Sequence, residues 1–359
     1  MANILDIRRR IRSVVNTRQI TKAMKVVSAA KLRRAQDRTL AARPYAQMLT
    51  NVLKSLVARS EIYDPETGAP RHPLLAQRPE KNILLIVVTG DKGLAGAFSA
   101  NITKAATRFI ESKPGKNIEI EAIGRKGRDF FRRRYPAAPM QTRSLADTDE
   151  ALETRPAGER AAAIQITGEH VGVLGKLQFD QARTLAENVI ERYQREEIDS
   201  VYLVFNEFKS VIAQRLIVEQ ILPIGQIGEQ AVRLAEEMPE EEKKKAKEAA
   251  VSAGVGMRRS ESPAEDAAAQ FGTAQVDYIY EQPPEDLFRA LLPKYVAIQI
   301  FRALLESVAA EHAARMTAMD SATRNATDMI DSLTLAMNRA RQAKITKEII
   351  EIVSGAAAM

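Results

Sequence analysis

Two long stretches without glycine or proline, one near each end of the chain, restrict the possible folds more than any other feature of this sequence. They cover residues 1–43 and 294–354. At 1.5 Å per residue, continuous helices over these stretches would be roughly 65 Å and 90 Å long. Helices of globular proteins average only about 11–12 residues, so helices this long need a partner along their length, usually in a coiled coil. Pro44 is expected to kink or interrupt the first helix, which resumes up to residue 59.

The apolar residues of both stretches support a coiled coil with an irregular seam. Residues 4–14, 291–308 and 345–352 carry mostly apolar side chains at alternating spacings of three and four, the pattern that faces a partner helix. Between the last two segments the seam narrows to small residues such as Ala318 and Ala326. A partner helix must therefore approach closely there. Because the two helices flank a middle region of the same chain, an antiparallel pairing within the chain is the simplest arrangement.

The middle of the chain shows a different pattern, in which β-rich runs alternate with helical segments. We expect strands at residues 83–88, 118–123, 201–205 and 276–280, and helices at residues 97–112, 125–134 and 171–195. Such alternation is typical of an α/β layer with a mostly parallel sheet. The predicted units are an N-terminal helix (1–60), an α/β domain (75–285) and a C-terminal helix (286–359).

Residues 229–270 stand apart from both patterns. Residues 236–248 are dense in charge, and residues 251–270 are small, polar and weakly patterned. A segment of this composition buries too little apolar surface to offset the cost of ordering it. We therefore expect a mobile or weakly helical insertion within the α/β domain.

The sequence offers few candidates for chemistry. Glycines in residues 90–96 follow an expected strand, but their spacing matches neither a phosphate-binding loop nor a dinucleotide fingerprint, so we expect a structural turn. His72, His170 and His312 lack the spacing of metal ligands, and we expect them at the surface or at an interface. The absence of cysteine excludes disulfides and Cys-bound zinc. We predict no catalytic residue, no cofactor and no metal.

Positive charge is concentrated near the N-terminus. The chain has a net charge of +7, and residues 8–38 hold many Lys and Arg side chains while residues 1–40 hold only two acidic ones, Asp6 and Asp37. A solvated helix face, a nucleic acid and an acidic protein surface would each explain this charge. No aromatic residue precedes Tyr45 to stack on bases, and no helix-turn-helix or RRM signature is present.

The sequence predicts no segment that crosses a membrane. The first ten residues lack the apolar core of a secretory signal, and the longest aliphatic run, residues 83–88, is far shorter than the roughly 20 residues that a span needs. We expect any association with a membrane to go through a partner.

Motifs at both ends of the chain resemble the γ subunit family of F-type rotary ATP synthases. The matching segments are 11–14, 16–24 and 28–32 near the N-terminus, 91–96 and 124–127 in the middle, and 313–319, 338–346 and 348–357 near the C-terminus. The resemblance covers almost the whole chain except residues 229–270. It implies a fold of the α/β class, with a long antiparallel coiled coil of the N- and C-terminal helices plus a Rossmann-like α/β domain.

The resemblance also implies a function. In that family the chain is a non-catalytic rotor shaft whose coiled coil lies inside a ring of α and β subunits. Its globular part sits with the ε subunit on the membrane c-ring, and proton flow through the c-ring turns the shaft and drives the catalytic β subunits through their conformations. The implied location is peripheral, on the cytoplasmic side of a bacterial inner membrane.

The resemblance further implies contacts with the β subunit at Met24, Lys25, Arg341, Gln342, Thr346 and Glu348. We expect the first two to lie opposite the other four, with coiled-coil packing or a solvated face as the alternative for each. The insertion falls where plastid relatives carry a redox-regulated segment. Because such a switch needs two cysteines and this sequence has none, we predict no thiol regulation.

Two other classes of protein stay open from the sequence. One is a basic coiled-coil protein that binds nucleic acid, which salt-dependent DNA binding would indicate. The other is a Rossmann-like enzyme, which a nucleotide bound to residues 75–285 would indicate.

Overall fold

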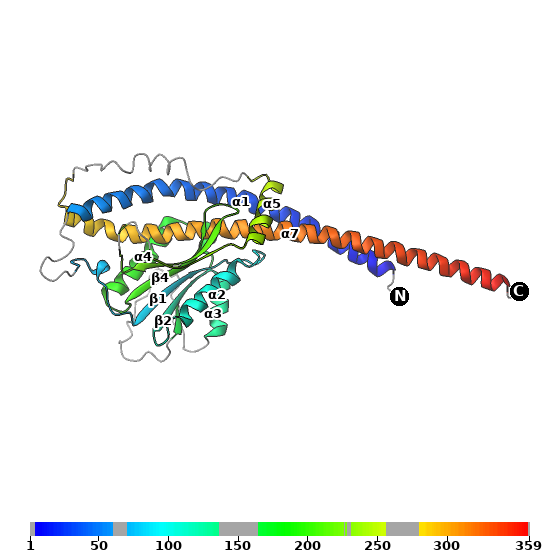
Figure 1. Ribbon diagram of the computed structural model, residues 1–359, viewed down its shortest axis with the longest axis horizontal. Helices are drawn as coiled ribbons and strands as arrows, with labels where there is room; N and C mark the ends of the chain where they lie inside the picture. The colour runs from blue at the N-terminus through cyan, green and yellow to red at the C-terminus, as the bar shows by residue number, and fades with distance from the viewer. Residues whose placement is uncertain are drawn as a thin grey trace.

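Two long helices run side by side and end in a projecting shaft, with a sheet domain packed against the half away from the chain termini (Figure 1). The computed structural model describes residues 4–59, 70–135, 164–225, 227, 231–255 and 280–357. The long helices are α1 (Ile4–Arg59) and α7 (Pro284–Ala357). Both chain termini lie at the same end of the molecule (Figure 1), so the pair is antiparallel as predicted.

The two helices differ from expectation at their prolines. α1 continues through Pro44, and α7 begins ten residues earlier than the proline-free stretch and contains Pro293. A proline inside a helix removes one backbone hydrogen bond and crowds the preceding turn. Neighbouring residues of both helices, such as Leu49 and Leu292, are buried in a core. This packing holds the helix together where propensity alone would end it.

The sheet has six strands in the order β3-β2-β1-β4-β5-β6. Their bounds are β1 Asn82–Val88, β2 Asn117–Ile123, β3 Ile164–His170, β4 Ser200–Phe208, β5 Gln214–Leu222 and β6 Ala231–Glu237. β3, β2, β1 and β4 pair in parallel, whereas β5 and β6 add antiparallel to β4. The three expected strands at 83–88, 118–123 and 201–205 are confirmed as β1, β2 and β4. The expected strand at 276–280 lies almost entirely outside the described residues, and Tyr280 is not in a strand.

Shorter helices cover both faces of this sheet. They are α2 Phe98–Glu111, α3 Arg125–Arg134, α4 Phe179–Gln194 and α5 Glu240–Ser252. The side chains of β1 alternate between two hydrophobic cores, as the two-residue period of a strand requires. Leu84 and Ile86 pack with α4 and the C-terminal part of α1. Leu85 and Val87 pack with α2, α3 and α5 on the other side. Burial on both faces explains why β1 is a continuous aliphatic run.

The predicted insertion is partly built into this domain. β6 extends the sheet by pairing with β5, and α5 packs on α7 with Ala246, Ala249 and Ala250 buried. Residues 231–252 were expected to form a separate insertion, but they pack onto the domain. The backbone edge of β5 and the alanine face of α5 provide contacts that composition alone does not reveal. Residues 256–270 lie outside the described residues.

α7 belongs to both cores before it leaves the domain. Its residues from Phe288 to Leu305 lie in the first core, and those from Ala309 to Met316 lie in the second. The long helix and the sheet domain are thus one packed body at this level. The long helices and the sheet share the same two cores. The predicted domain boundaries at residues 60, 75 and 286 therefore stay a prediction.

Gly124 provides a test of how tightly the C-terminal ends of the parallel strands are packed. It has φ +95°, and a Cβ there would lie 2.0 Å from the Thr89 carbonyl oxygen. We expect Gly124→Ala to lower the free energy of unfolding by about 3 kcal/mol or more, because backbone strain and a clash add together. Chemical denaturation of the full chain measures this. Gly115→Ala is the control, since Gly115 also has a positive φ but no atom within 4 Å of the added Cβ. It should cost only about 1 kcal/mol, and equal losses in the two variants would contradict the packing described here.

Candidate functional site

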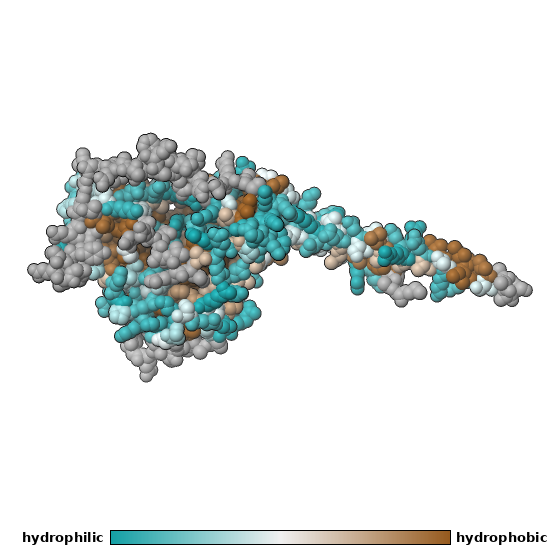
Figure 2. Space-filling view, in the orientation of Figure 1, coloured by the Kyte–Doolittle hydropathy of each residue, from teal (hydrophilic) through white to brown (hydrophobic). Residues whose placement is uncertain are grey.

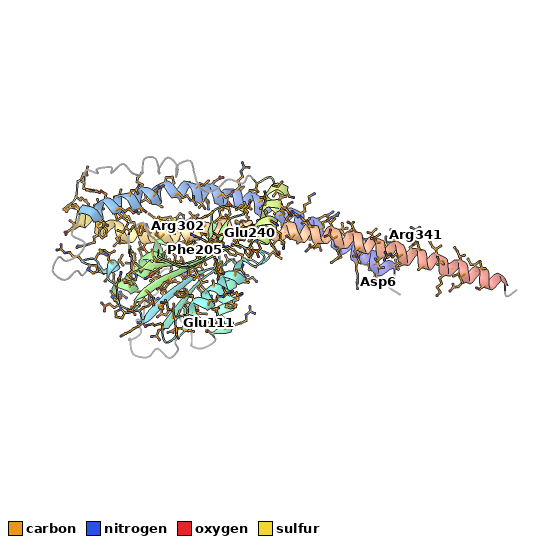
Figure 3. All side chains as sticks on the ribbon, in the orientation of Figure 1. Asp6, Glu111, Phe205, Glu240, Arg302 and Arg341 are labelled. Carbon is orange, nitrogen blue, oxygen red and sulfur yellow. The ribbon has the colours of Figure 1, made fainter. Side chains whose placement is uncertain are left out.

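The candidate site is the end of α7 that projects beyond α1. Residues 341–354 are all exposed. The pairing register explains this exposure: Lys25 meets Asp320 and Thr21 meets Thr323, so Arg341 lies near the first described turn of α1. Figure 3 shows Arg341 and Asp6 at nearly the same level of the shaft. Beyond that level α7 has no partner helix among the described residues.

This single-helix end combines an apolar face with polar side chains. Its exposed large hydrophobic residues are Ile345, Ile349, Ile350, Ile352 and Val353, and Figure 2 shows hydrophobic residues gathered near the end of the shaft. Isoleucines at positions 345, 349 and 352 share a face at helical spacing. Exposed apolar side chains clustered in this way mark a contact surface for another protein rather than a free end.

Four of the predicted contact residues lie on this end. Arg341, Gln342, Thr346 and Glu348 are exposed. The Thr346 hydroxyl donates to the Gln342 carbonyl oxygen at 3.0 Å, and Glu348 forms a long 3.6 Å ion pair with Lys344. Such exposed pairs stabilise little. The side chains of Arg341 and Gln342 therefore stay available for charge-assisted and amide hydrogen bonds with a partner.

The structure does not bring Met24 and Lys25 to this end, and the expectation that they lie opposite the other four residues is wrong. Lys25 is buried, and its ammonium group donates to Asp320 at 3.1 Å and to Ser252 at 2.7 Å. Asp320 precedes Arg341 by 21 positions, or roughly 30 Å along a helix. Met24 is half-buried beside Lys25. Contact of either residue with a partner stays a prediction.

The glycine-rich loop after β1 is occupied by side chains of the chain itself. A Cβ at Gly90 would lie 2.8 Å from a carboxylate oxygen of Glu311, which also pairs with Arg315 at 2.5 Å. Asp91 accepts hydrogen bonds from the backbone N–H groups of Arg125 and Gly172 at 3.0 and 3.1 Å. The two carboxylates at this loop would repel a phosphate. Asp91 also accepts the backbone N–H groups that could otherwise donate to a phosphate. The predicted structural turn is thus the arrangement found.

The three histidines have local partners. His72 accepts from the backbone N–H of Leu74 at 3.2 Å, and His312 lies 3.2 Å from Arg315. Burial, and then the charge of Arg315, lower the pKa of His312 to about 4. His170 is buried and lies 2.6 Å from Glu121, so the expectation of a surface or interface position is wrong for this residue. In the described ranges, His, Asp and Glu side chains form no group of three or more that could hold a metal ion.

A buried charge cluster lies where α7 crosses the sheet domain. Arg302 binds both carboxylate oxygens of Glu219 at 3.0 and 3.2 Å. Glu306 lies one turn further along α7 and is buried, with one carboxylate oxygen lacking a hydrogen-bond partner among the described residues. Burial raises the pKa of Glu306 to about 7, although Arg302 opposes the shift. A cavity of about 870 Å³ between α1 and α7 borders this cluster.

The shifted pKa of Glu306 gives the stability of the chain a pH dependence. Its folded pKa of about 7 lies above the ordinary value of 4.5. The contribution of Glu306 to the free energy of unfolding is therefore fully present below about pH 4.5 and is lost as the pH rises through 7. Glu306→Gln removes the ionisable group. The free energy of unfolding of this variant, minus that of the unsubstituted chain, should therefore rise by about 3 kcal/mol between pH 4.5 and pH 8. Denaturant titrations at several pH values measure this. The exposed control Glu187→Gln should show no such trend, and a flat difference for Glu306→Gln would contradict the burial of a neutral acid.

Most basic side chains of α1 face solvent. Arg8, Arg9, Lys22, Lys31 and Arg33 are exposed, whereas Lys25 is used inside the molecule. This distribution fits a solvated or partner-facing helix surface. As for membranes, no helix in the described part of the chain is both long enough and apolar enough to span one.

Comparison with known proteins decides among the candidate classes. The family described as "ATP synthase" matches residues 3–359. The ATP synthase gamma chain of Solibacter usitatus is 47% identical over 358 residues, covering 100% of this chain and 99% of that one. The chain belongs to the family of ATP synthase gamma chains. A second relative, the ATP synthase gamma chain of Anaeromyxobacter sp. strain Fw109-5, is 42% identical and covers 100% of both chains. These matches extend through residues 229–270.

A solved structure is also similar in part. It is the central stalk and c-ring of the mitochondrial ATP synthase of Tetrahymena thermophila, with a TM-score of 0.49 and 20% identity over 84% of this chain and 99% of that chain.

Proposed function

We propose that the chain is the central rotor shaft of a proton-translocating ATP synthase and has no catalytic site of its own. The observation that carries this proposal is the continuity of α7. One helix runs from the two cores of the sheet domain to an exposed end bearing both apolar and polar contact residues. Such a helix passes a force from one partner, held by the domain, to another partner, held at the tip.

The proposed action depends on asymmetry. A single helical tip inside a ring of three catalytic β subunits contacts each of them differently at any moment. A contact that is more favourable with one conformation of a subunit shifts that subunit's population toward it. Rotation of the shaft then moves this preference around the ring, so that proton flow at the base drives ATP synthesis at the tip. Arg341, Gln342, Thr346 and Glu348 are the residues we assign to the β contact.

The proposed partners follow from the two ends of the molecule. The tip engages the α and β subunits, and the sheet domain engages the ε subunit and the membrane c-ring. We place the chain as a peripheral protein on the cytoplasmic side of a bacterial inner membrane, held there by these partners. We propose that it needs no cofactor, and the carboxylates of Glu311 and Asp91 at the loop after β1 disfavour a bound phosphate there.

The proposal predicts that the matching α and β subunits depend on this chain for turnover. Co-expression with and without the chain should yield a complex containing one copy per several α and β subunits, with ATPase activity that requires it. Deleting residues 341–359 should greatly lower that activity without preventing the sheet domain from folding. Failure to co-purify, together with unchanged turnover, would remove the shaft proposal and make salt-dependent DNA binding the next test.

A narrower prediction concerns two side chains at the tip. Arg341→Ala combined with Gln342→Ala should lower ATPase turnover of the complex at least about tenfold, because losing 1.4 kcal/mol of contact energy at the rate-limiting step suffices for that factor. Arg183→Ala on α4, which removes another exposed arginine, this one from the sheet domain, is the control and should leave turnover unchanged. Equal effects of the two variants would argue against a contact at the tip.

A further inference from the structure

The cavity of about 870 Å³ between α1 and α7 lies beside the sheet domain, away from the tip. Its lining comes from the C-terminal half of α1, the N-terminal half of α7, the start of α4 and the end of β4. Glu306 on this lining precedes Arg341 by 35 positions, or roughly 50 Å along a helix. Cavities that hold small ligands measure roughly 300–1,000 Å³. This cavity is therefore large enough for a small molecule and is separate from the proposed β contact.

Part of the cavity wall is aromatic. Phe179, the first residue of α4, meets Phe301 of α7 edge to face, with ring centroids 5.4 Å apart. Phe179 is 39% exposed, and Tyr45 of α1, which also lines the cavity, is 58% exposed. Aromatic rings offer a large apolar area and pair well with further rings, either stacked or edge-on. This wall therefore fits a flat aromatic group.

The buried side of the cavity has hydrogen-bonding groups that the described residues leave unused. Arg302 and Glu306 of α7 both line the cavity. The Nε atom of Arg302 and one carboxylate oxygen of Glu306 have no hydrogen-bond partner in the described ranges, and Glu306 is only 3% exposed. Buried polar atoms are nearly always paired in native proteins. The two unpaired atoms therefore point to an occupant that carries polar atoms of its own.

The charges around the cavity favour an anion. Its lining has more basic than acidic side chains: Arg43, Lys54, Lys209 and Arg302 against Glu207 and Glu306. Glu207 is paired with Arg215 at 3.0 Å, and burial raises the pKa of Glu306 to about 7, so that this side chain is largely uncharged below neutral pH. Lys54 and Lys209 are exposed and form no ion pair with a described residue. Two unpaired cations beside a cavity attract a negatively charged group.

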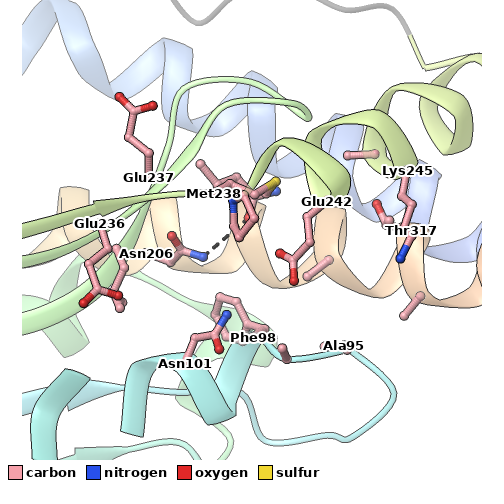
Figure 4. Close-up of a pocket in the computed structure, with 18 of the residues that line it drawn as sticks. Ala95, Phe98, Asn101, Asn206, Glu236, Glu237, Met238, Glu242, Lys245 and Thr317 are labelled. Atoms are coloured by element: carbon pink, nitrogen blue, oxygen red, sulfur yellow. Dashed lines mark hydrogen bonds between the residues drawn. The ribbon is translucent and has the colours of Figure 1, made fainter. Parts of the chain in front are cut away.

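The crevice between α2, α5 and α7 has a different character. It measures about 350 Å³, and Figure 4 shows Glu236, Glu237 and Glu242 among the residues that line it. Glu236 is already paired with Arg108 at 2.5 Å. Three carboxylates around a small space repel an anion. The combination of an aromatic wall and unpaired cations therefore distinguishes the larger cavity.

We propose that the cavity between α1 and α7 binds a small amphipathic anion with a flat aromatic body. The body lies on the wall formed by Phe179 and Phe301, and the anionic group lies beside Lys54 and Lys209. A ligand in this position touches both long helices and the sheet domain at once. The inference goes beyond the proposed function, because it depends on the cavity alone and not on rotation.

Two dyes with the same ring system test this site. Anilinonaphthalene sulfonate carries one negative charge, whereas N-phenylnaphthylamine carries none, and both fluoresce more strongly in apolar surroundings. Each dye is titrated into the full-length chain, and the fluorescence gives its Kd and the number of sites. We expect a single saturable site for the sulfonate dye. Its binding should slow hydrogen exchange of residues 39–54 and 295–306, which line the cavity.

The cations are tested by Lys54→Gln combined with Lys209→Gln, which leaves the aromatic wall in place. The Kd of the sulfonate dye should rise at least about fivefold, because two exposed charges each contribute modestly to its attraction. The Kd of the uncharged dye should stay the same. Lys176→Gln combined with Lys247→Gln removes two exposed lysines elsewhere on the chain. This matched control should change neither Kd.

The exposed isoleucines of the tip are a second apolar surface to which a dye can bind. Ile349→Ser combined with Ile352→Ser removes part of that surface and should leave the Kd of the sulfonate dye unchanged. Three outcomes would overturn the inference: no saturable binding of the sulfonate dye to the unsubstituted chain, the same Kd in the two lysine variants, or loss of binding in the tip variant. None of these measurements needs ATPase activity, so the cavity and the proposed function can fail separately.

Discussion

The double role of α7 is the constraint on which the rest of the structure depends. The same helix closes both hydrophobic cores of the sheet domain and forms the axis of the shaft. A helix that only lay on the domain could roll or slide when pulled at its tip. Residues from Phe288 to Met316 prevent this, because interior packing is dense and yields little. Load applied at Arg341 therefore reaches the sheet through one continuous hydrogen-bonded helix.

The antiparallel partner α1 supplies what α7 lacks beyond the domain. A lone helix in water gains little stability from propensity, and most of its stability comes from packing. Along the shaft the seam is made of small residues and one polar layer rather than large apolar side chains, so close approach and matched charges define the pairing. The tip after residue 341 has no such support among the described residues, which leaves its isoleucine face for another protein.

Much of this architecture was predictable because its signals are local. Long stretches without glycine or proline marked α1 and α7, and the aliphatic runs at β1, β2 and β4 marked the parallel strands. β3 and the antiparallel strands β5 and β6 were missed, although the aliphatic run in the middle of β5, residues 216–218, is typical of a buried strand. The continuation through Pro44 was not predictable, since tertiary packing of distant residues overrides the local cost of a proline.

The candidate site was predicted in part for the same reason. Exposed residues such as Arg341 and Gln342 belong to sequence motifs that can be matched one by one. Lys25 belongs to such a motif as well, but its partner Asp320 is 295 positions away, and no local pattern shows which charge will be buried against it. The burial of Glu306 and His170 likewise depends on strands and helices that meet only in the folded chain.

Direct observation of rotation tests the central claim most simply. The single variant Lys176→Cys gives one labelling site on an exposed position of the sheet domain in a chain that otherwise has no cysteine. A probe attached there would be followed while the complex, immobilised through its α and β subunits, hydrolyses ATP. The account predicts stepwise rotation in one direction that stops when ATP is removed. A label that stays still while ATP is hydrolysed at the normal rate would contradict it.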